Sequence, residues 1–415
     1  MSSASGGIVS ATKAPSRTII ISALGVTQIF AWGTSYYLPA VLAAPIVADT
    51  GWSLTSVVGG LSLGLLTAGV VSPVAGRTIA RRGGRPVLAV SAALLSMGLL
   101  ALALAHSLAA FLLAWLVMGL GMGAGLYDPA FATLGRLYGE GGRSAITTLT
   151  LFGGFASTVC WPLSAFLNAH LGWRGACFVY AAVQVAVALP IYLFVLPRET
   201  QRPVTPLATA AAPTPAAALA IPQRGLFVLL ATTITLASII STMLSVHLLT
   251  ILQGKGIALA AAVSLGALVG PSQVAARTIE IFIARFHHPI WTKLAATSLV
   301  TVGLAALWTG SPVITLALVL YGAGIGLESI ARGTLPLAIF GSERYPVVMG
   351  RIAMPSLIAQ AAAPSIGALL LEIGGLNGAF AVFLTTAGCN ALLVVGLFLM
   401  LRSRKSGRKQ SLDVP

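Results

Sequence analysis

Three ionisable residues lie inside otherwise apolar stretches of this chain: Asp128, Glu328 and Arg332. A charge within a membrane-spanning helix costs roughly 2.5 to 3.5 kcal/mol on insertion scales, so each of the three needs a reason to be there. A carboxyl group in a desolvated cavity can load and release a proton, and a guanidinium group binds carboxylates. These residue types indicate proton coupling at Asp128 and Glu328 and anion binding at Arg332.

The spacing of these residues leaves alternatives open. Glu328 and Arg332 are four residues apart and share a helix face, so they can neutralise each other. In the functional interpretation, Glu328 releases Arg332 when a substrate anion arrives; in the alternative, the two form a permanent ion pair. Asp128 precedes Pro129, and its alternative role is a structural carboxylate bonded to a neighbouring helix.

Aromatic and polar side chains add candidates for substrate contact. Gln28, Trp32 and Tyr36 recur every four residues and so share one helix face, which could stack against a ligand. Ser241 belongs to a stripe of hydroxyl residues at 238–245. Core packing and helix-to-helix hydrogen bonding are the alternatives for these two groups. With Arg332, the candidate substrate-binding residues are Gln28, Trp32, Tyr36, Tyr127, Ser241 and Gln360.

The elements that hold these residues are long apolar stretches. About 20 helical residues cross roughly 30 Å of hydrocarbon, and we count twelve such stretches. A composition with 57% hydrophobic and 8% charged residues excludes a water-soluble protein. We therefore predict an all-α membrane protein, with transmembrane helices near 18–46, 53–79, 86–105, 109–138, 144–170, 175–197, 225–252, 257–279, 289–308, 311–340, 346–372 and 377–401.

The positive charges predict the orientation in the membrane. With both termini cytoplasmic, 21 of the 24 Lys and Arg residues fall on the cytoplasmic side, including Lys293, and this asymmetry favours N-in and C-in topology. The net charge of +15 is then topogenic and indicates attraction to anionic membrane lipid, so we predict no nucleic-acid partner. We expect a multi-pass protein of the plasma (inner) membrane.

The chain divides into two similar halves. The Pro- and Ala-rich residues 198–224 read as a cytoplasmic linker between six-helix bundles at 18–197 and 225–401, with tails at 1–17 and 402–415. VAGRTIA at 74–80 recurs as VAARTIE at 274–280, and GAGL at 123–126 is echoed by GIGL at 324–327. These echoes predict a two-fold repeat of six-helix units.

Over essentially its full length the chain resembles a transporter of the major facilitator superfamily. Gly76, Arg81, Gly83 and Arg85 fit the superfamily's signature between its second and third helices, although Ala80 stands where an Asp is usual and Arg136 where a second Asp is usual. Arg277 and Glu280 occupy the equivalent positions in the second half. The resemblance implies two bundles that rock about a central site. It also implies a conformational latch formed by Gly76, Arg81, Gly83, Arg85, Arg277 and Glu280. The alternative role of these residues is topogenesis and lipid binding.

From these observations we predict a secondary active transporter, not an enzyme, that moves a small polar or anionic organic solute by alternating access. The sequence has no phosphate-binding nucleotide loop, so the expected drive is an ion gradient, with protons as the coupling ion for Asp128 and Glu328. No cofactor or metal is expected, and the resemblance implies a monomer. The alternatives are a proton-coupled exporter of toxic compounds, such as drugs or metalloids, and uptake of a vitamin-like aromatic solute.

Overall fold

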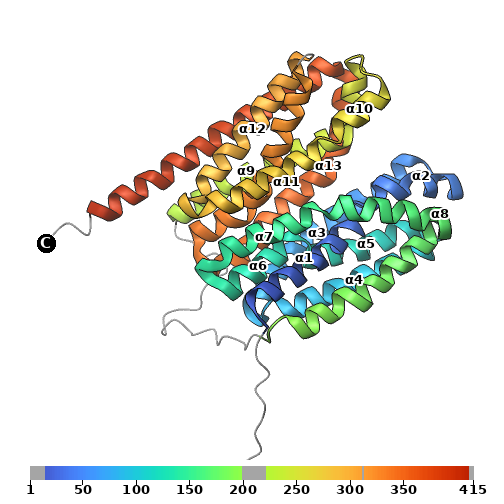
Figure 1. Cartoon of the computed structure of the whole chain (residues 1–415), viewed down its shortest axis with the longest axis horizontal. Helices are drawn as coiled ribbons and strands as arrows, with labels where there is room; N and C mark the ends of the chain where they lie inside the picture. The colour runs from blue at the N-terminus through green and yellow to red at the C-terminus, as the bar shows by residue number, and fades with distance from the viewer. Residues whose placement is uncertain (1–14, 199–220, 311–312, 411–415) are drawn as a thin grey trace, which may run out of the picture.

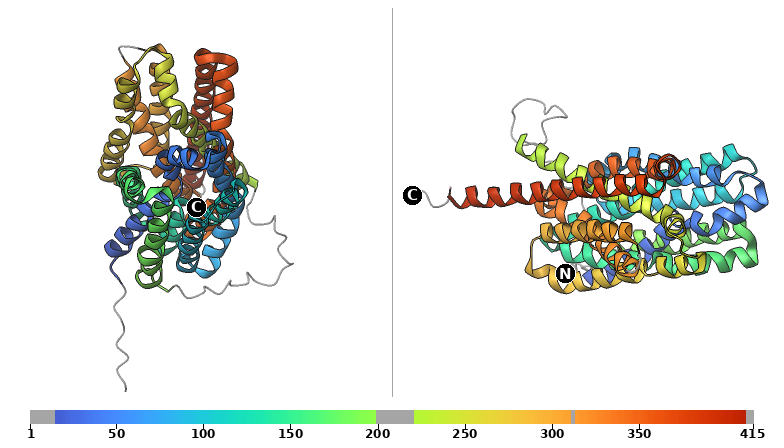
Figure 2. Two further views of the ribbon diagram at one scale, coloured as in Figure 1. Left: turned by 90° about the vertical axis from the view of Figure 1, so that its right-hand side faces the viewer. Right: turned by 90° about the horizontal axis from the view of Figure 1, so that it is seen from above.

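Two bundles of helices lie side by side in the computed structural model, which describes residues 15–198, 221–310 and 313–410 (Figure 1). The first bundle holds α1 to α8 and the second holds α9 to α13. The last turns of α13 project beyond the bundles toward the C-terminus (Figure 2). Most of the predicted N-terminal tail 1–17, most of the predicted linker 198–224 and the end of the tail 402–415 lie outside the described residues.

The first bundle is built from eight α-helices and three short segments. A 3-10 turn (Gly139–Gly141) joins α6 to α7, and π-helical turns (Gln184–Ala188 and Ile191–Val195) follow α8. The helices are α1 (Arg17–Gly33), α2 (Leu38–Thr50), α3 (Leu54–Arg82), α4 (Gly84–Ala103), α5 (Leu108–Gly125), α6 (Tyr127–Tyr138), α7 (Gly142–Gly154) and α8 (Ala156–Val183).

The second bundle is built from five α-helices, which range from 8 to 97 residues. A 3-10 turn (Ala284–Phe286) follows α11. The helices are α9 (Ile221–Gly254), α10 (Leu259–Gly266), α11 (Val269–Ile283), α12 (Pro289–Thr309) and α13 (Ile314–Gln410). Glycines with positive φ bend two of the longest helices: Gly172 (φ 69°) in α8, and Gly341 (φ 72°) and Gly375 (φ 58°) in α13. Glycine adopts this conformation without a steric penalty, so the chain reverses direction without a loop.

These bends lie at three of the predicted helix boundaries. The described residues contain eight apolar helical stretches long enough to cross a membrane, and two of them, with 88 and 90 residues, run through the bends. Four predicted helices are instead interrupted. The range 18–46 breaks before α2, whose first turn holds Pro39, and the range 109–138 breaks at Leu126, whose extended backbone (ψ −162°) separates α5 from α6. The range 144–170 is divided between α7 and α8 at Phe155, and the range 257–279 between α10 and α11.

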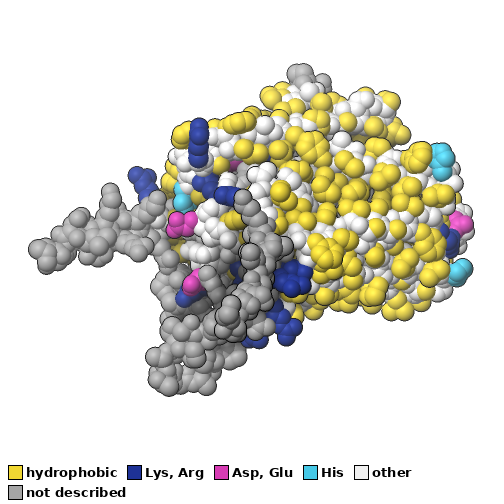
Figure 3. Space-filling model, turned by 60° about the horizontal axis from the view of Figure 1, so that its bottom comes forward, with side chains coloured by type: hydrophobic (Ala, Val, Ile, Leu, Met, Phe, Trp, Pro, Cys, Tyr) yellow, Lys and Arg dark blue, Asp and Glu magenta, His cyan; other side chains and the backbone are white. Residues whose placement is uncertain are grey.

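The surface has two chemical regions. Hydrophobic side chains cover the flanks, and Lys and Arg gather toward one end (Figure 3). Val70, Leu113, Phe194 and Leu392 each expose 61% or more of their area, an arrangement suited to lipid rather than to water. The exposed arginines in the last turns of α3 mark the other region, here called the arginine-rich end, and are Arg77, Arg81 and Arg82.

The two bundles touch near the arginine-rich end through backbone contacts. A Cβ atom on Gly76 of α3 would lie 2.4 Å from the carbonyl oxygen of Pro346, and one on Gly350 would lie 2.4 Å from that of Ser72. Only glycine permits such an approach between α3 and α13. On the other side of the interface, α7 packs against α11. These two contacts position the charged residues described next.

Candidate functional site

An ion pair between Asp128 and Arg332 joins the two halves. The Arg332 Nε donates to Asp128 Oδ1 at 2.9 Å and its Nη2 donates to Oδ2 at 2.8 Å, so the contact is two-pronged. The side chains are only 14% and 10% exposed. Arg332 Nη1 donates to the hydroxyls of Ser356 (2.9 Å) and Ser238 (3.3 Å). All three guanidinium nitrogens are thus engaged, and the pair bridges α6 and α13.

A second buried ion pair lies beside the first. Lys293 of α12 donates to Glu328 Oε1, and the lysine side chain is 1% exposed. The proposed pairing of Glu328 with Arg332 is therefore not formed in this structure, because each residue has a different partner in space. Counting Lys293 with the cytoplasmic charges was wrong, because its ammonium group is buried between helices of the second bundle.

Arg277 is a third buried cation at the interface, and it is only 4% exposed. Its Nη1 donates to the Thr150 carbonyl of α7 at 3.0 Å, its Nη2 to Gln273 Oε1 at 3.2 Å, and its Nε to the Gly326 carbonyl at 3.4 Å. All of these acceptors are neutral. Among the described residues, no ion pair with a carboxylate involves Arg277, unlike Arg332. A buried charge without an opposite charge is expensive, so this guanidinium is suited to an incoming anion.

An aromatic cluster borders Arg277. The Trp32 ring centre lies 4.9 Å from that of Tyr127 and 5.3 Å from that of Tyr36, so the predicted aromatic face meets helix α6. The indole Nε1 of Trp32 is buried without a hydrogen-bond partner in the described structure. The Tyr127 hydroxyl lies 3.4 Å from the same Thr150 carbonyl that Arg277 binds. The cluster thus offers an apolar surface next to a cation.

Of the remaining predicted contact residues, Gln360 joins the hydrogen-bond network of Arg332, whereas Gln28 and Ser241 lie outside it. Gln28 is fully buried within the first bundle, where its amide donates to the Gly125 carbonyl at 2.7 Å and braces the end of α5. Gln360 donates to Ser356 Oγ at 3.3 Å and so joins the network of Arg332. Ser241 contributes its carbonyl to the Tyr321 hydroxyl (3.4 Å) and lies outside that network of charged residues.

The predicted latch residues also differ in their surroundings. Gly76 lies at the contact between the halves, and Gly83 (φ 81°) makes the tight turn between α3 and α4. Arg81 is exposed and Arg85 is half-buried at the arginine-rich end.

In the second half, Glu280 is 2% exposed and accepts a hydrogen bond from Thr292 Oγ1 at 2.6 Å. Its carboxylate also lies 3.8 Å from the Arg143 guanidinium of α7 and 3.6 Å from His287 Nε2. Arg277 and Glu280 therefore each reach α7 of the first bundle.

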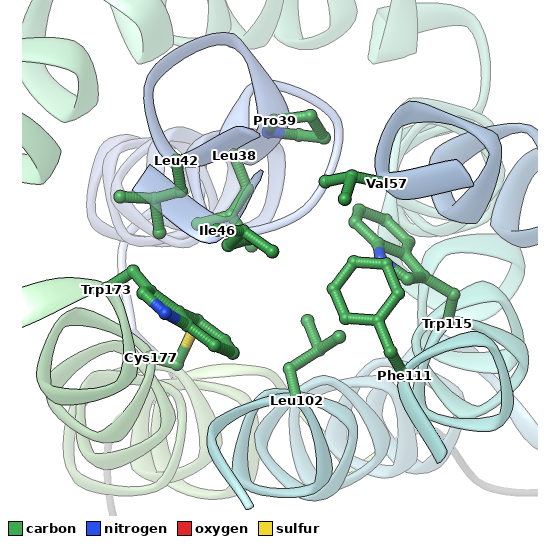
Figure 4. Close-up of a pocket in the computed structure, with 10 residues that line it drawn as sticks. All are labelled: Leu38, Pro39, Leu42, Ile46, Val57, Leu102, Phe111, Trp115, Trp173 and Cys177. Atoms are coloured by element: carbon green, nitrogen blue, oxygen red, sulfur yellow. The ribbon is translucent and has the colours of Figure 1, made fainter. Parts of the chain in front are cut away.

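Two of the cavities in the described structure differ in polarity. One lies inside the first bundle and is lined by apolar side chains that surround an open space (Figure 4). Its lining has no charge for an anion, and consists of Leu38, Pro39, Leu42, Ile46, Val57, Leu102, Phe111, Trp115, Trp173 and Cys177. The other lies between the halves and is bordered by Asp128, Ser72 and Gly350.

Sequence reasoning missed part of this site. Lys293 lies four residues after Pro289, about one helical turn inside an apolar stretch. This position within the stretch indicated that the charge of Lys293 does not lie in a loop. Ser356, Thr150 and Gln273 gave no comparable signal, because a lone polar residue in an apolar helix is common. Only the packing of α7 and α11 shows that Thr150 faces Arg277.

Comparisons with known proteins agree with this architecture. A sequence profile of the Major Facilitator Superfamily matches residues 24–287. Mouse monocarboxylate transporter 11 is 32% identical over 135 residues, which span 32% of this chain and 29% of that protein.

Solved structures show the same fold over nearly the whole chain. The human organic anion transporter MFSD10 has a TM-score of 0.69 at 16% identity and covers 92% of this chain and 100% of its own. The fucose:proton symporter of E. coli has a TM-score of 0.71 at 14% identity and covers 93% and 99%. The proton:xylose symporter XylE has a TM-score of 0.68 at 12% identity and covers 93% and 95%.

The fold and the interface between its halves define a multi-pass, helical membrane protein of the transporter class. The chain belongs to the Major Facilitator Superfamily, whose members are transporters and not enzymes.

Proposed function

We propose that this chain is a secondary transporter that moves a small organic anion by alternating access, coupled to protons. The observation that carries the proposal is the pair of buried guanidinium groups at the interface between the halves, one neutralised by Asp128 and the other, Arg277, held only by neutral groups. A carboxylate that enters between the bundles would meet an unneutralised cation. The monocarboxylate and organic anion transporters among the similar proteins support this substrate class.

Arg277 is a better anchor for the anion than Arg332. An anion can bind Arg332 only by displacing a two-pronged carboxylate, whereas at Arg277 it replaces two carbonyls and an amide. Trp32 and Tyr127 lie beside Arg277 and would contact the apolar body of the solute. Our sequence-based hypothesis assigned the anchor to Arg332, and the neutralisation of that residue moves the proposal to Arg277.

Asp128 and Arg332 then couple proton binding to solute movement in this proposal. A proton that binds Asp128 removes its negative charge and weakens the two-pronged contact between α6 and α13. The space beside Asp128 has room for about one water molecule, through which a proton could reach the carboxylate. Protonation would thus release the halves from each other at this point, and solute movement would require it.

The topology that goes with this function is also a proposal. The bends at Gly172, Gly341 and Gly375, together with the 3-10 turn Gly139–Gly141 between α6 and α7, support a division of the two longest apolar stretches into six crossings, and with them a total of twelve. We assign bundles to 18–197 and 225–401 and place the arginine-rich end and both termini on the cytoplasmic side of a plasma (inner) membrane. The unit of function is a monomer in contact with membrane lipid.

A binding measurement tests the anion site directly. The thermal unfolding midpoint of the purified chain is measured with panels of monocarboxylates, sugars and hydrophobic cations. We expect carboxylates to raise the midpoint, because a ligand that binds the folded state stabilises it. Arg277→Gln should abolish this shift, whereas the control Arg174→Gln, in an ion pair within the first bundle, should keep it. A carboxylate shift that survives Arg277→Gln would contradict the proposal.

A second function is favoured by one observation. The rings of Trp32, Tyr36, Tyr37, Tyr127 and Trp161 form a chain of contacts with centroids 4.9 to 6.2 Å apart. Such a surface suits hydrophobic toxic compounds, and the chain would then be an exporter. It also suits a vitamin-like aromatic solute. In the same measurement, a midpoint shift by hydrophobic cations that is indifferent to Arg277→Gln would favour export.

A further inference from the structure

Four largely buried charges of alternating sign are neighbours at the interface. Asp128 of the first bundle contacts Arg332, Arg332 lies one helical turn from Glu328 on α13, and Glu328 contacts Lys293 of α12. The first pair crosses between the bundles, and the second pair lies within the second bundle. Tyr345 is close to the first pair, but its hydroxyl already donates to the Gly333 carbonyl at 2.6 Å.

The charges balance only while the bundles are together. With all four residues ionised, the first bundle contributes one negative charge and the second bundle one net positive charge. Movement of α6 away from α13 would leave Arg332 with its serine partners but without the opposite charge of Asp128. An arginine keeps its proton under all conditions found in proteins, so it needs another anion. Glu328 is four residues away on the same helix, at the spacing that allows contact between side chains.

We propose that Glu328 is an exchange carboxylate, which pairs with Lys293 while the halves are joined and with Arg332 when they separate. This inference rests on the proposed alternating access. Lys293 can take part because a desolvated lysine, unlike an arginine, can lose its proton. When Glu328 leaves, one N–H bond of the Lys293 ammonium breaks and its proton passes to water, while Asp128 gains a proton from water. The charges of these four residues then sum to zero within each bundle, so the exchange permits separation.

A distance measurement between the bundles tests the exchange without a substrate. Spin labels are attached at Arg82→Cys and Glu343→Cys, two exposed positions on opposite halves, in a Cys389→Ser background. Pulsed dipolar spectroscopy then gives the populations of short and long distances between acidic and neutral pH. The double variant Glu328→Gln/Lys293→Met keeps the charges balanced but removes the exchange carboxylate.

We expect opposite effects from two variants. Lys293→Met frees Glu328 for Arg332 and should raise the long-distance population. The double variant leaves Arg332 only Asp128 and should lower that population at least about fivefold, a coupling of the size usual between linked equilibria. The matched control Asp49→Asn/Arg174→Gln, which removes an ion pair within the first bundle, should not change it.

A pair that is merely structural gives a different result. The double variant would then match the unmodified chain, and that result would overturn the exchange while leaving the proposed transport intact. If the unmodified chain shows no long-distance population at any pH or with any solute of the panels, alternating access itself fails, and the exchange fails with it.

Discussion

Arg77 and Arg277 occupy the same place in the two copies of a repeated motif, yet their surroundings differ. Arg77 is exposed at the end of α3, whereas Arg277 is 4% exposed and binds the Thr150 carbonyl of the other half. A topogenic arginine near a helix end is stabilised by water and lipid headgroups. Its buried counterpart has neither, and this difference is what makes Arg277 a candidate for binding a substrate anion.

The Asp128 carboxylate should be worth more to stability than any exposed carboxylate of this chain. Asp128→Asn leaves the buried Arg332 guanidinium without its opposite charge, and breaking such a pair costs roughly 3 to 5 kcal/mol. We expect a clearly lower unfolding midpoint in detergent. Asp49→Asn, at a half-exposed pair with Arg174, should change the midpoint little. Equal effects of the two changes would show that the Asp128–Arg332 pair is not the buried bridge described here.

At the scale of elements, the sequence predicted helices well and their interruptions poorly. Apolar length located the spans, because a helix must satisfy its own backbone in hydrocarbon. The break at Leu126 depends on packing, since Gln28 reaches from α1 to the adjacent Gly125 carbonyl, whereas the break before α2 has a local signal in Pro39. The partner of Arg332 was also not predicted. Spacing along one helix suggested Glu328, but the carboxylate that binds Arg332 is that of Asp128, 204 residues away in sequence.

The contact between α3 and α13 predicts that alanine substitutions at Gly76 and Gly59, two glycines of α3, differ in their effect on the joined conformation. Gly76→Ala would place a Cβ atom 2.4 Å from the Pro346 carbonyl, and overpacking of this kind typically costs about 1 to 3 kcal/mol. The joined conformation should lose population in the distance measurement between positions 82 and 343. Gly59→Ala is the control, since no atom lies within 4 Å of its added Cβ. A joined population that is unchanged by Gly76→Ala would rule out this contact as a close one.

At the scale of the molecule, two bundles share an interface to which they contribute unequal charges. The first contributes Asp128 and the Thr150 carbonyl, and the second contributes Arg332, Arg277 and the Lys293–Glu328 pair. Neither bundle completes the site alone. A solute anion and a proton would therefore act on the same interface, the anion at Arg277 and the proton at Asp128, and this common interface is the physical basis of the proposed coupling.

The most direct test of this account is a coupled flux measurement. The chain is reconstituted in liposomes that contain a pH-sensitive dye, and the uptake of a carboxylate identified by the thermal panel is recorded together with internal pH. We predict that solute entry acidifies the interior, that Arg277→Gln abolishes both signals, and that Asp128→Asn abolishes the proton signal. Carboxylate flux without any proton movement, or flux that persists unchanged in both variants, would contradict the account.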